Sequence, residues 1–407
     1  MQKDQIFQRG TLKTYIIGSV PSYESLDVTC KDKNEVFIFI DFNNMIKGLY
    51  YPKMLEMILN QIQMNNGVFP SILISEWMIL QNYLEQYAKS RNIDKFHVVY
   101  FSEGGQSYYH KNILKNYKNK RKNALFQLPP SVSNNYKSYD DINDLIRGFL
   151  VSSWKWIEII SKQSNILSIR LENLDADFIP ELLLRKFNIY NDEAVYIILS
   201  SDGDMLQTLD IADNIYIYNG NEIISDKNWI KSKSYLDPYN KKNDNIDTKD
   251  SSEPIILIEN NDKYSNITPD KIILFKALVG DTSDNIPGIK GVGVKGFFEK
   301  FIDIIPSDVR ADDIDEIENI CKNNMEQNKI CAKIIHDFDT FKNMIRLVSF
   351  KMLINWLQLN QQRYSIIQNI IEQNKNALIN SCNFLEIKNK NNQNSNIFLQ
   401  NSELKEI

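Results

Sequence analysis

The sequence predicts an α/β fold, in which a mostly parallel sheet is flanked by helices and followed by a helical domain. Four short apolar runs, rich in β-branched and aromatic residues, have the composition of buried strands, and segments of helical periodicity separate them. A chain of 407 residues, 43% of them hydrophobic, is long enough to form two globular domains. The four predicted strands cover residues 36–40, 97–101, 166–169 and 195–199.

Weaker patterns complete the predicted first domain. Apolar residues recur every three to four positions at residues 75–89 and again at 142–160, which predicts two helices. A further strand pair at 215–218 and 222–224 flanks Asn219-Gly220-Asn221, a sequence that favours a hairpin turn. Alternation of strands and helices is typical of a sheet with helical connections.

The second half of the chain predicts a helical domain. Thr268-Pro269 is a favourable start for a helix that runs to about Leu278, and a second helix is expected at residues 294–301. Polar, lysine- and asparagine-rich runs have little to bury and predict irregular or disordered segments. The predicted organisation is an N-terminal extension at 1–34, a first domain at 35–233, a polar connection at 234–266, a helical domain at 267–380 and a disordered tail at 381–407.

Composition narrows the class of protein and the kind of site. No run approaches the roughly 20 apolar residues of a membrane span, and the N-terminus lacks the apolar core of a signal peptide, so we expect a cytoplasmic protein with no membrane partner. The four cysteines are far apart and are expected to stay reduced. The three histidines are scattered, which argues against a histidine-rich metal site or a nucleophile-histidine-aspartate triad. Carboxylates are therefore the expected carriers of chemistry.

A basic segment with several tyrosines interrupts a chain whose net charge is −5. Residues 104–139 contain no acid and carry a local charge of +7. Such a segment suits a phosphate backbone, and its tyrosines could stack on unpaired bases. The alternative is a solvated helix face. The residues expected to contact nucleic acid here are Tyr108, Lys111, Lys115 and Tyr117.

Carboxylates follow three of the predicted strands and gather in two further short segments. The carboxyl edge of an open α/β sheet is where sites assemble, so acids at several strand ends are expected to converge. A single acid at a strand end is more often a helix cap than a ligand, but several together favour a site. The candidate ligands are Asp41, Glu103, Asp175, Asp177, Asp202, Asp204, Asp281 and Asp284.

A ligand set made of carboxylates alone favours a hard cation, Mg²⁺ or Mn²⁺. Clustered carboxylates repel one another strongly, and a metal is their natural counter-charge. Two such ions about 4 Å apart suit in-line displacement at phosphorus. The pattern therefore predicts two bound ions and hydrolysis of a phosphodiester.

A glycine-rich loop follows the last two acids. Gly288, Gly291 and Gly293 permit positive φ angles and close approach, so backbone N–H groups ahead of the next helix can point at a phosphate. Lys290 and Lys295 would add positive charge there. Alone, such a loop would be interpreted as an ordinary turn before a helix. Because it lies next to Asp281 and Asp284, the loop is instead expected to bind nucleic-acid phosphates.

Four motifs resemble those of a known family, the phage and bacterial 5′-3′ exonucleases of the flap endonuclease superfamily. They are GDTSDNIPGIKGVGVKG, which looks like the helix-three-turn-helix signature, with SSDGDMLQ, YKNKR and IDFNN. The resemblance covers roughly residues 35–301 and implies a PIN-like first domain with a DNA-binding helix-three-turn-helix at 267–302. It further implies that the aspartates named above match metal-ligand or neighbouring acid positions. Lys118 and Arg121 would contact the scissile phosphate from a basic arch at about 104–139.

Three departures from the family pattern fall near the site. The segment FSEGG has Ser102 and then Glu103 where the family places an aspartate, so Glu103 is a candidate replacement one residue late. Phe178 replaces the last acid of the family's EADD pattern. Gly48 stands where an arginine is expected downstream of Asp41. The first two changes fall at metal-ligand positions of the family, and the third concerns the positioning of the substrate.

The resemblance implies a metal-dependent 5′ nuclease that cleaves near a 5′ end or flap in replication or repair. Its expected partner is DNA with a 5′ end or flap, or an RNA–DNA primer, and the sequence does not identify a polymerase or single-strand-binding partner. Two other functions fit part of the pattern. A nuclease-defective DNA-binding accessory protein is disfavoured by the retained Asp202 and Asp204, and a PIN-type ribonuclease would not explain the glycine-rich loop.

Overall fold

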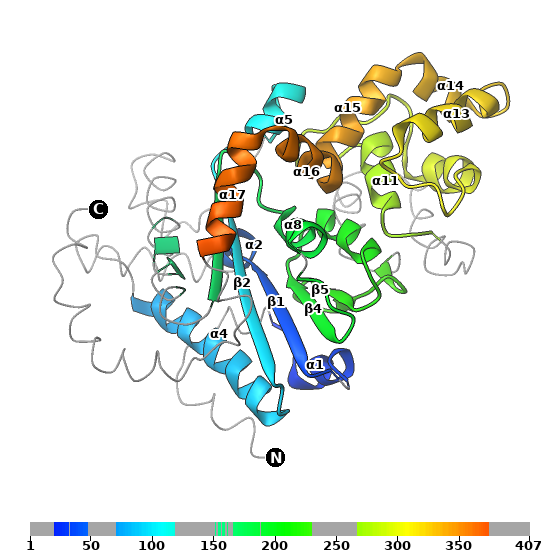
Figure 1. Cartoon of the computed structure of the whole chain (residues 1–407). Helices are drawn as coiled ribbons and strands as arrows, with labels where there is room; N and C mark the ends of the chain where they lie inside the picture. Colours follow the sequence, from blue (N-terminus) through cyan, green and yellow to red (C-terminus); the bar gives the residue numbers. More distant parts are fainter. Residues whose placement is uncertain are drawn as a thin grey trace, which may run out of the picture. The chain divides into compact units, whose positions relative to one another are not determined.

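The computed structural model describes residues 20–31, 33–47, 71–118, 166–187, 189–229 and 267–373, with single positions between 151 and 161 (Figure 1). The predicted connection at 234–266 and tail at 381–407 lie outside these residues, as does most of the predicted helix at 142–160. The chain forms two compact units, one of Met1–Tyr100, Gln127–Ser168 and Asn374–Ile407, the other of Phe101–Phe126 and Ile169–Gln373. Within the described residues, no helix is both long enough and apolar enough to cross a membrane.

The described strands form one six-stranded mixed sheet in the order β3-β2-β1-β4-β5-β6. β4 and β5 are parallel, and β5 and β6 form an antiparallel hairpin in which Tyr218 pairs with Ile223. The first five positions follow a doubly wound order, in which sites assemble at the carboxyl ends of the strands. The strands are β1 (Glu35–Asp41), β2 (Lys95–Gly104), β3 (Ile166–Glu172), β4 (Ala194–Leu199), β5 (Ile215–Tyr218) and β6 (Ile223–Ile224).

The predicted α/β fold, its four strands and the weaker hairpin are therefore confirmed. Every residue of β4 is buried, as are six of the seven residues of β1. Strands that are covered on both faces are apolar along their whole length, which explains the continuous apolar runs in the sequence. All four strands are longer than predicted, and in two of them the extension includes a candidate ligand: Asp41 is the last residue of β1, and Glu103 lies inside β2.

In the first unit, α1 (Tyr23–Thr29) packs on α4 (Ser71–Ser90), which begins four residues earlier than predicted. The Tyr23 hydroxyl donates to the Tyr83 carbonyl at 3.0 Å, and the Tyr83 hydroxyl donates to the Pro21 carbonyl at 2.5 Å. The short α2 (Phe42–Lys47) follows β1 directly, and Phe42 packs edge-on against the buried Trp154. These aromatic contacts anchor the helices of the unit.

The second unit contains the predicted helical domain. Its central helix, α11, is buried along almost its whole length, and α15 packs directly against it (Figure 1). α13 and α14 form the next pair, while α5 contacts α15 and α16 contacts α8. The helices are α5 (Tyr108–Ile113), α8 (Ile179–Lys186), α11 (Lys271–Val279), α13 (Ile314–Asn324), α14 (Lys329–His336), α15 (Phe338–Val348), α16 (Phe350–Leu359) and α17 (Gln361–Gln373), with the 3₁₀ helix η4 (Gly203–Asp210).

The predicted helix at residues 294–301 is present, but it is not a regular α-helix. The structure has a single α-helical turn, α12 (Val294–Gly296), followed by a π-helical turn, η7 (Phe297–Phe301), and a 3₁₀ turn, η8 (Ile302–Ile304). Phe297 and Phe298 are both buried against Phe275, with ring centroids 5.2 and 5.7 Å from it. Consecutive residues of an α-helix point about 100° apart, so the wider π turn lets both rings reach one neighbour.

Two glycines shape the junction between α11 and the glycine hairpin, as we call residues 288–295. Gly280 has φ 93° and Gly288 has φ 67°, both in the left-handed region. They lie so close that a Cβ on Gly288 would stand 2.5 Å from the Gly280 nitrogen. The Ile289 N–H also donates to the Leu278 carbonyl at 2.8 Å. The hairpin is therefore fastened to the end of α11.

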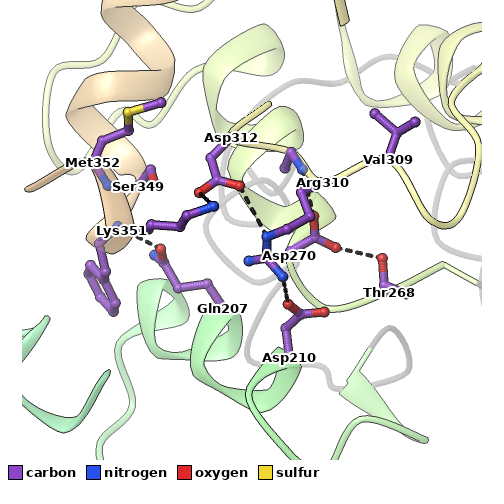
Figure 2. Close-up of polar contacts among 12 residues, drawn as sticks. Gln207, Asp210, Thr268, Asp270, Val309, Arg310, Asp312, Ser349, Lys351 and Met352 are labelled. Carbon is purple, nitrogen blue, oxygen red and sulfur yellow. Dashed lines mark hydrogen bonds and ion pairs between the residues drawn. The ribbon is translucent and has the colours of Figure 1, made fainter. Parts of the chain in front are cut away.

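A group of hydrogen bonds and ion pairs around Arg310, the Arg310 cluster, joins η4, α11 and α16 to the loop before α13 (Figure 2). It consists of Asp210, Asp270, Arg310, Asp312 and Lys351. Arg310 donates from Nη1 to Asp210 and from Nε to Asp312 at 3.2 Å, while Lys351 Nζ lies 2.9 Å from the other oxygen of Asp312. Asp270, just before α11, accepts the backbone N–H of the residue after Arg310 at 2.6 Å. The cluster therefore fixes the C-terminal end of η4 and the start of α11.

Gln207 gives η4 a further attachment, in which both the nitrogen and the oxygen of its side-chain amide have partners within the protein. Its Nε2 donates to the carbonyls of Asp204 at 3.0 Å and Val348 at 3.1 Å, and its Oε1 accepts the Phe350 N–H at 2.8 Å. A buried amide satisfied in this way fixes one orientation. η4 is therefore held to the α15–α16 junction.

Arg310→Met is expected to lower the thermal unfolding midpoint by about 4 to 8 °C. Removing the guanidinium leaves the largely buried Asp210 and Asp312 without one of their donors, at a cost of about 2 kcal/mol. Differential scanning fluorimetry measures the midpoint, with Arg310→Lys as the conservative control that keeps a cation. A midpoint unchanged in Arg310→Met would contradict a fastening role for the cluster.

Gly288→Ala is expected to destabilise the protein, whereas Gly293→Ala is tolerated. A Cβ at Gly288 meets backbone atoms at 2.5 to 2.6 Å and requires a positive φ that by itself costs about 1 to 2 kcal/mol. Gly293 has φ −115° and no atom within 4 Å of an added Cβ. Thermal melts of the two variants provide the comparison, and equal midpoints would show that the tight packing at Gly288 does not matter.

Candidate metal and nucleic-acid site

Three acids of the second unit lie close enough together to share a metal ion. Asp204, Asp281 and Asp284 each offer a carboxylate oxygen, and these oxygens lie within 4.8 Å of one another. Asp204 stands in the first turn of η4, and the other two belong to the loop that follows α11. A group of hard oxygen donors at this spacing fits a divalent cation.

The acid turn, residues 281–286, holds two of these acids in a closed loop. The Asp281 N–H donates to the Ile286 carbonyl at 2.9 Å, and the reverse hydrogen bond measures 2.8 Å. The N–H and hydroxyl of Ser283 donate to Asp281 Oδ1 at 2.8 and 2.6 Å. Burial raises the pKa of Asp281, but Lys276 and the Ser283 hydrogen bonds outweigh it and hold that pKa well below its usual value. Asp281 is therefore kept as a carboxylate.

Asp202 and Asp204, which follow β4, have different surroundings. The Asp202 carboxylate accepts the Asp204 N–H at 3.0 Å and so caps η4, which is the ordinary role of an acid at this position. Asp204 instead faces the acid turn. Burial raises the pKa of Asp204 to about 7 in spite of Lys276, and the neighbouring Asp202, Asp281 and Asp284 add to the rise. The repulsion among these acids shows the need for a counter-charge.

Lys276 supplies part of that counter-charge, although the sequence reasoning did not identify it. Its Nζ lies 2.5 Å from Asp204 Oδ1 and 3.0 Å from Asp281 Oδ2. Burial lowers the pKa of Lys276, but the surrounding acids raise it well above its usual value. A lysine in the apolar run KIILFKALV was the available signal, because buried lysines almost always have a partner.

Asp175 is the centre of a second group of contacts. Its Oδ2 accepts the Tyr117 hydroxyl at 2.8 Å and lies 3.1 Å from Lys118 Nζ and 3.2 Å from His110 Nδ1. Burial raises the pKa of Asp175, but Lys118, His110 and Tyr117 overcome this and lower it to about 2. His110 was also missed by the sequence reasoning, and Ser107, whose hydroxyl lies 2.7 Å from its Nδ1, fixes the ring.

Tyr117 joins the two groups of acids. Its hydroxyl lies 3.2 Å from Asp284 Oδ2 as well as 2.8 Å from Asp175, and its ring stacks on His110 with centroids 4.5 Å apart. The ring is only 4% exposed, so in this arrangement it has no face for a base, contrary to the stacking expected from the sequence. Tyr108 is 51% exposed, and the Arg363 guanidinium lies over its ring, with Cζ 5.0 Å from the ring centroid.

Lys118 is placed by the backbone around it. Its N–H donates to the Asp284 carbonyl at 3.0 Å, and Asn285 Nδ2 donates to the Asn116 carbonyl at 2.8 Å. Both Lys118 and Asn285 have positive φ angles, 53° and 61°. The turn at residues 115–118 is therefore attached to the acid turn, and the predicted site residue Arg121 lies outside the described residues.

The Lys118 ammonium balances several acids at once. Besides Asp175, its Nζ lies 3.9 Å from Glu103 Oε2 and 4.0 Å from Asp284 Oδ2. Burial lowers the pKa of Lys118, but these acids raise it well above its usual value. The structure thus brings Glu103 to the edge of the site, where the sequence predicted a replacement ligand.

The two remaining predicted ligands, Asp177 and Asp41, belong to different units. Asp177 is half buried and is close enough to Lys118 to raise its pKa. Asp41 belongs to the first unit, where it is buried at the end of β1 and accepts the Asn44 N–H at 2.9 Å. Its ligand role stays a prediction.

The predicted DNA-contacting residues are mostly on the surface. In the glycine hairpin Gly288 is buried, whereas Lys290, Gly291, Gly293 and Lys295 are exposed. Lys111 on α5 is half exposed and contacts Gln106, and Lys115 is exposed. These positions are consistent with phosphate contacts, and their role in binding DNA stays a prediction.

Comparisons with known proteins come from sequence and from fold. No family model matches the chain. A 5′-3′ exonuclease of Mycoplasmopsis pulmonis is 26% identical over 264 residues, which is 65% of this chain and 65% of that protein. A 5′-3′ exonuclease of Mycoplasma pneumoniae is 29% identical over 155 residues, covering 38% of this chain and 40% of that protein. The chain thus spans less than two thirds of the length of these relatives.

Two further comparisons concern a larger enzyme and a solved structure. DNA polymerase I of Caldicellulosiruptor bescii is 29% identical over 168 residues, covering 41% of this chain and 16% of that protein. The D15 flap endonuclease of bacteriophage T5, solved with DNA and metal ions, has a TM-score of 0.51 at 12% identity and covers 85% of this chain and 98% of that chain. This likeness shows the fold. In sequence the chain is similar to bacterial 5′-3′ exonucleases, and in fold it is similar to a phage flap endonuclease.

Proposed function

We propose that the chain is a divalent-metal-dependent nuclease that hydrolyses phosphodiester bonds of DNA at a 5′ end or 5′ flap, in replication or repair. The observation that carries the proposal is the group of carboxylates from Asp204, Asp281 and Asp284, whose oxygens lie within 4.8 Å of one another. Acids buried this close together require a cation, and phosphoryl transfer is the chemistry that such sites support. The names of the sequence relatives point to the same activity.

The acids are proposed to hold two hard cations, Mg²⁺ or Mn²⁺, as the sequence predicts. Asp204, Asp281 and Asp284 would hold one, and Asp175 with Glu103 is the natural start of a second group around Lys118. Bound ions would polarise the phosphoryl oxygens and lower the pKa of a water molecule. The assignment of individual ligands, Asp41, Asp177 and Asp202 among them, is part of the proposal.

The two lysines have a role beside the acids. In this arrangement the ammonium groups of Lys118 and Lys276 neutralise the carboxylates. Once a cation provides that neutralisation, both ammonium groups can donate to the oxygens of a scissile phosphate and stabilise the charge that develops there. Arg121, outside the described residues, is proposed to act with Lys118 as the family resemblance implies.

The substrate is proposed to be a duplex with a 5′ end or flap, held by the glycine hairpin. RNA–DNA primers are the second candidate substrate, because the same acids would cleave either backbone. A nuclease-defective DNA-binding protein would keep the hairpin without the chemistry. The retained acids disfavour this alternative.

Asp202→Asn/Asp204→Asn is expected to reduce metal-dependent cleavage of a labelled 5′-flap duplex by at least about a hundredfold, as loss of a charge-stabilising group does. Asp308→Asn/Asp339→Asn is the matched control, since both aspartates are exposed and distant in sequence from the acids. Gel analysis with and without Mg²⁺, on DNA and on RNA–DNA flaps, measures the rates. Binding without cleavage by the unmodified protein would favour the accessory protein, and equal cleavage by both double variants would reject the site.

Tyr117→Phe is expected to weaken Mn²⁺ binding by about tenfold, because the hydroxyl that orients Asp175 and Asp284 is removed. Tyr190→Phe, which removes an exposed hydroxyl bonded to Asp192, is the matched control. Isothermal titration calorimetry gives both affinities. If both variants bind Mn²⁺ as tightly as the unmodified protein, Tyr117 does not position the acids.

A further inference from the structure

We propose that Lys333, on α14, extends the duplex-binding surface of the glycine hairpin by donating to a backbone phosphate. This inference rests on the proposed function, because it names an additional contact for the same nucleic acid. Lys333 lies beyond residues 35–301, the range of the family motifs, so no sequence motif selects it.

Lys333 stands directly over the hairpin. Its Nζ donates to the Gly291 carbonyl at 2.8 Å, a contact between residues 42 positions apart. A Cβ added to Gly291 would lie 2.6 Å from this nitrogen, so the ammonium covers the Cα of the glycine. Gly291 also has φ 75°, which favours glycine at this position. The ammonium and the exposed hairpin backbone therefore form one surface.

The charge on Lys333 is left uncompensated in the described part of the chain. An ammonium has three N–H donors, and the Gly291 carbonyl takes one of them. No carboxylate of the described residues lies within ion-pair distance of Lys333 or of Lys290, and Lys295 has only Glu299 at 3.9 Å. Lys118 and Lys276, in contrast, each lie within ion-pair distance of two or more carboxylates. Two donors of Lys333 remain available to an anion.

The hairpin backbone beside Lys333 has donors to offer as well. Among the described residues, the N–H groups of Lys290, Gly291 and Gly293 have no hydrogen-bond acceptor. These positions are exposed, so water satisfies the groups until an anion replaces it. A phosphate oxygen at the hairpin would therefore meet backbone N–H groups and the ammonium together, a combination that suits a nucleic-acid backbone.

α14 is held in place to present this lysine. Asn328 caps the helix by accepting the Ile330 N–H at 2.9 Å, and its Nδ2 donates to the Lys300 carbonyl at 2.5 Å. Ile330 lies near Gly296, which follows the hairpin: a Cβ added to Gly296 would be 3.4 Å from Ile330 Cδ1. The approach of Lys333 to Gly291 is therefore set by the packing of α14.

The experiment measures equilibrium binding of a 5′-flap duplex in metal-free buffer between 50 and 200 mM salt. The logarithm of affinity falls linearly with the logarithm of salt concentration, and removing one phosphate-binding lysine diminishes the slope by about 1. Lys333→Met and Lys333→Gln are expected to reduce the slope by about one unit, and Lys333→Arg to keep it. Lys290→Met serves as the hairpin reference, and Lys342→Met, on α15, as the matched control with an unchanged slope.

The outcomes separate the possible roles of Lys333. Gln can still donate to the Gly291 carbonyl without carrying charge, so a reduced slope in this variant measures the phosphate contact alone. An unchanged slope in Lys333→Gln, whether or not affinity falls, would overturn the inference and leave only a structural role. Failure of the unmodified protein to bind the flap duplex and to cleave it with Mg²⁺ would reject the proposed function itself, and this inference with it.

Discussion

The neutralisation of buried acids by two lysines is the interaction on which the rest of the second unit depends. Asp204 and Asp281 share Lys276, while Asp175, Asp284 and Glu103 surround Lys118. Acids at this spacing repel one another by several kcal/mol when buried without counter-charge. The fold can therefore bring them together only where cations, whether side chains or metal ions, accompany them. This need explains why an apolar helix such as α11 carries Lys276 at its centre.

The surrounding structure keeps those charges at fixed positions. η4 is attached at its start through Asp204 and Lys276 and at its end through Asp210 and Arg310. α11 is likewise attached at Asp270 and at the acid turn. Two elements tied at both ends cannot slide along each other without breaking buried polar contacts, which is costly. The separation of the acids is thus set partly by their own contacts and partly by the remote contacts of Asp210 and Asp270.

The sequence predicted the strands and the helical domain because burial on both sides leaves a local signature, a short run of β-branched and aromatic residues. It could not predict features that depend on residues far apart in the chain. Lys276 meets Asp204 across 72 positions, and Tyr117 meets Asp284 across 167. The π turn at Phe297–Phe301 was missed for the same reason, since periodicity does not show that two adjacent rings share one neighbour. Acidic side chains were identifiable individually, but their partners were not.

The junction at Gly280 and Gly288 connects the acid turn to the glycine hairpin. Asp281 directly follows one of these glycines, and the glycine hairpin begins at the other, with their backbones in close contact. This short segment therefore fixes the hairpin relative to Asp281 and Asp284, the two acids of the acid turn. Flexible linkage would let the cut fall at many positions along a strand, whereas a segment locked by positive φ angles and backbone hydrogen bonds selects few. Under the proposed function, the same glycines that tighten the turn would also help to set where the strand is cut.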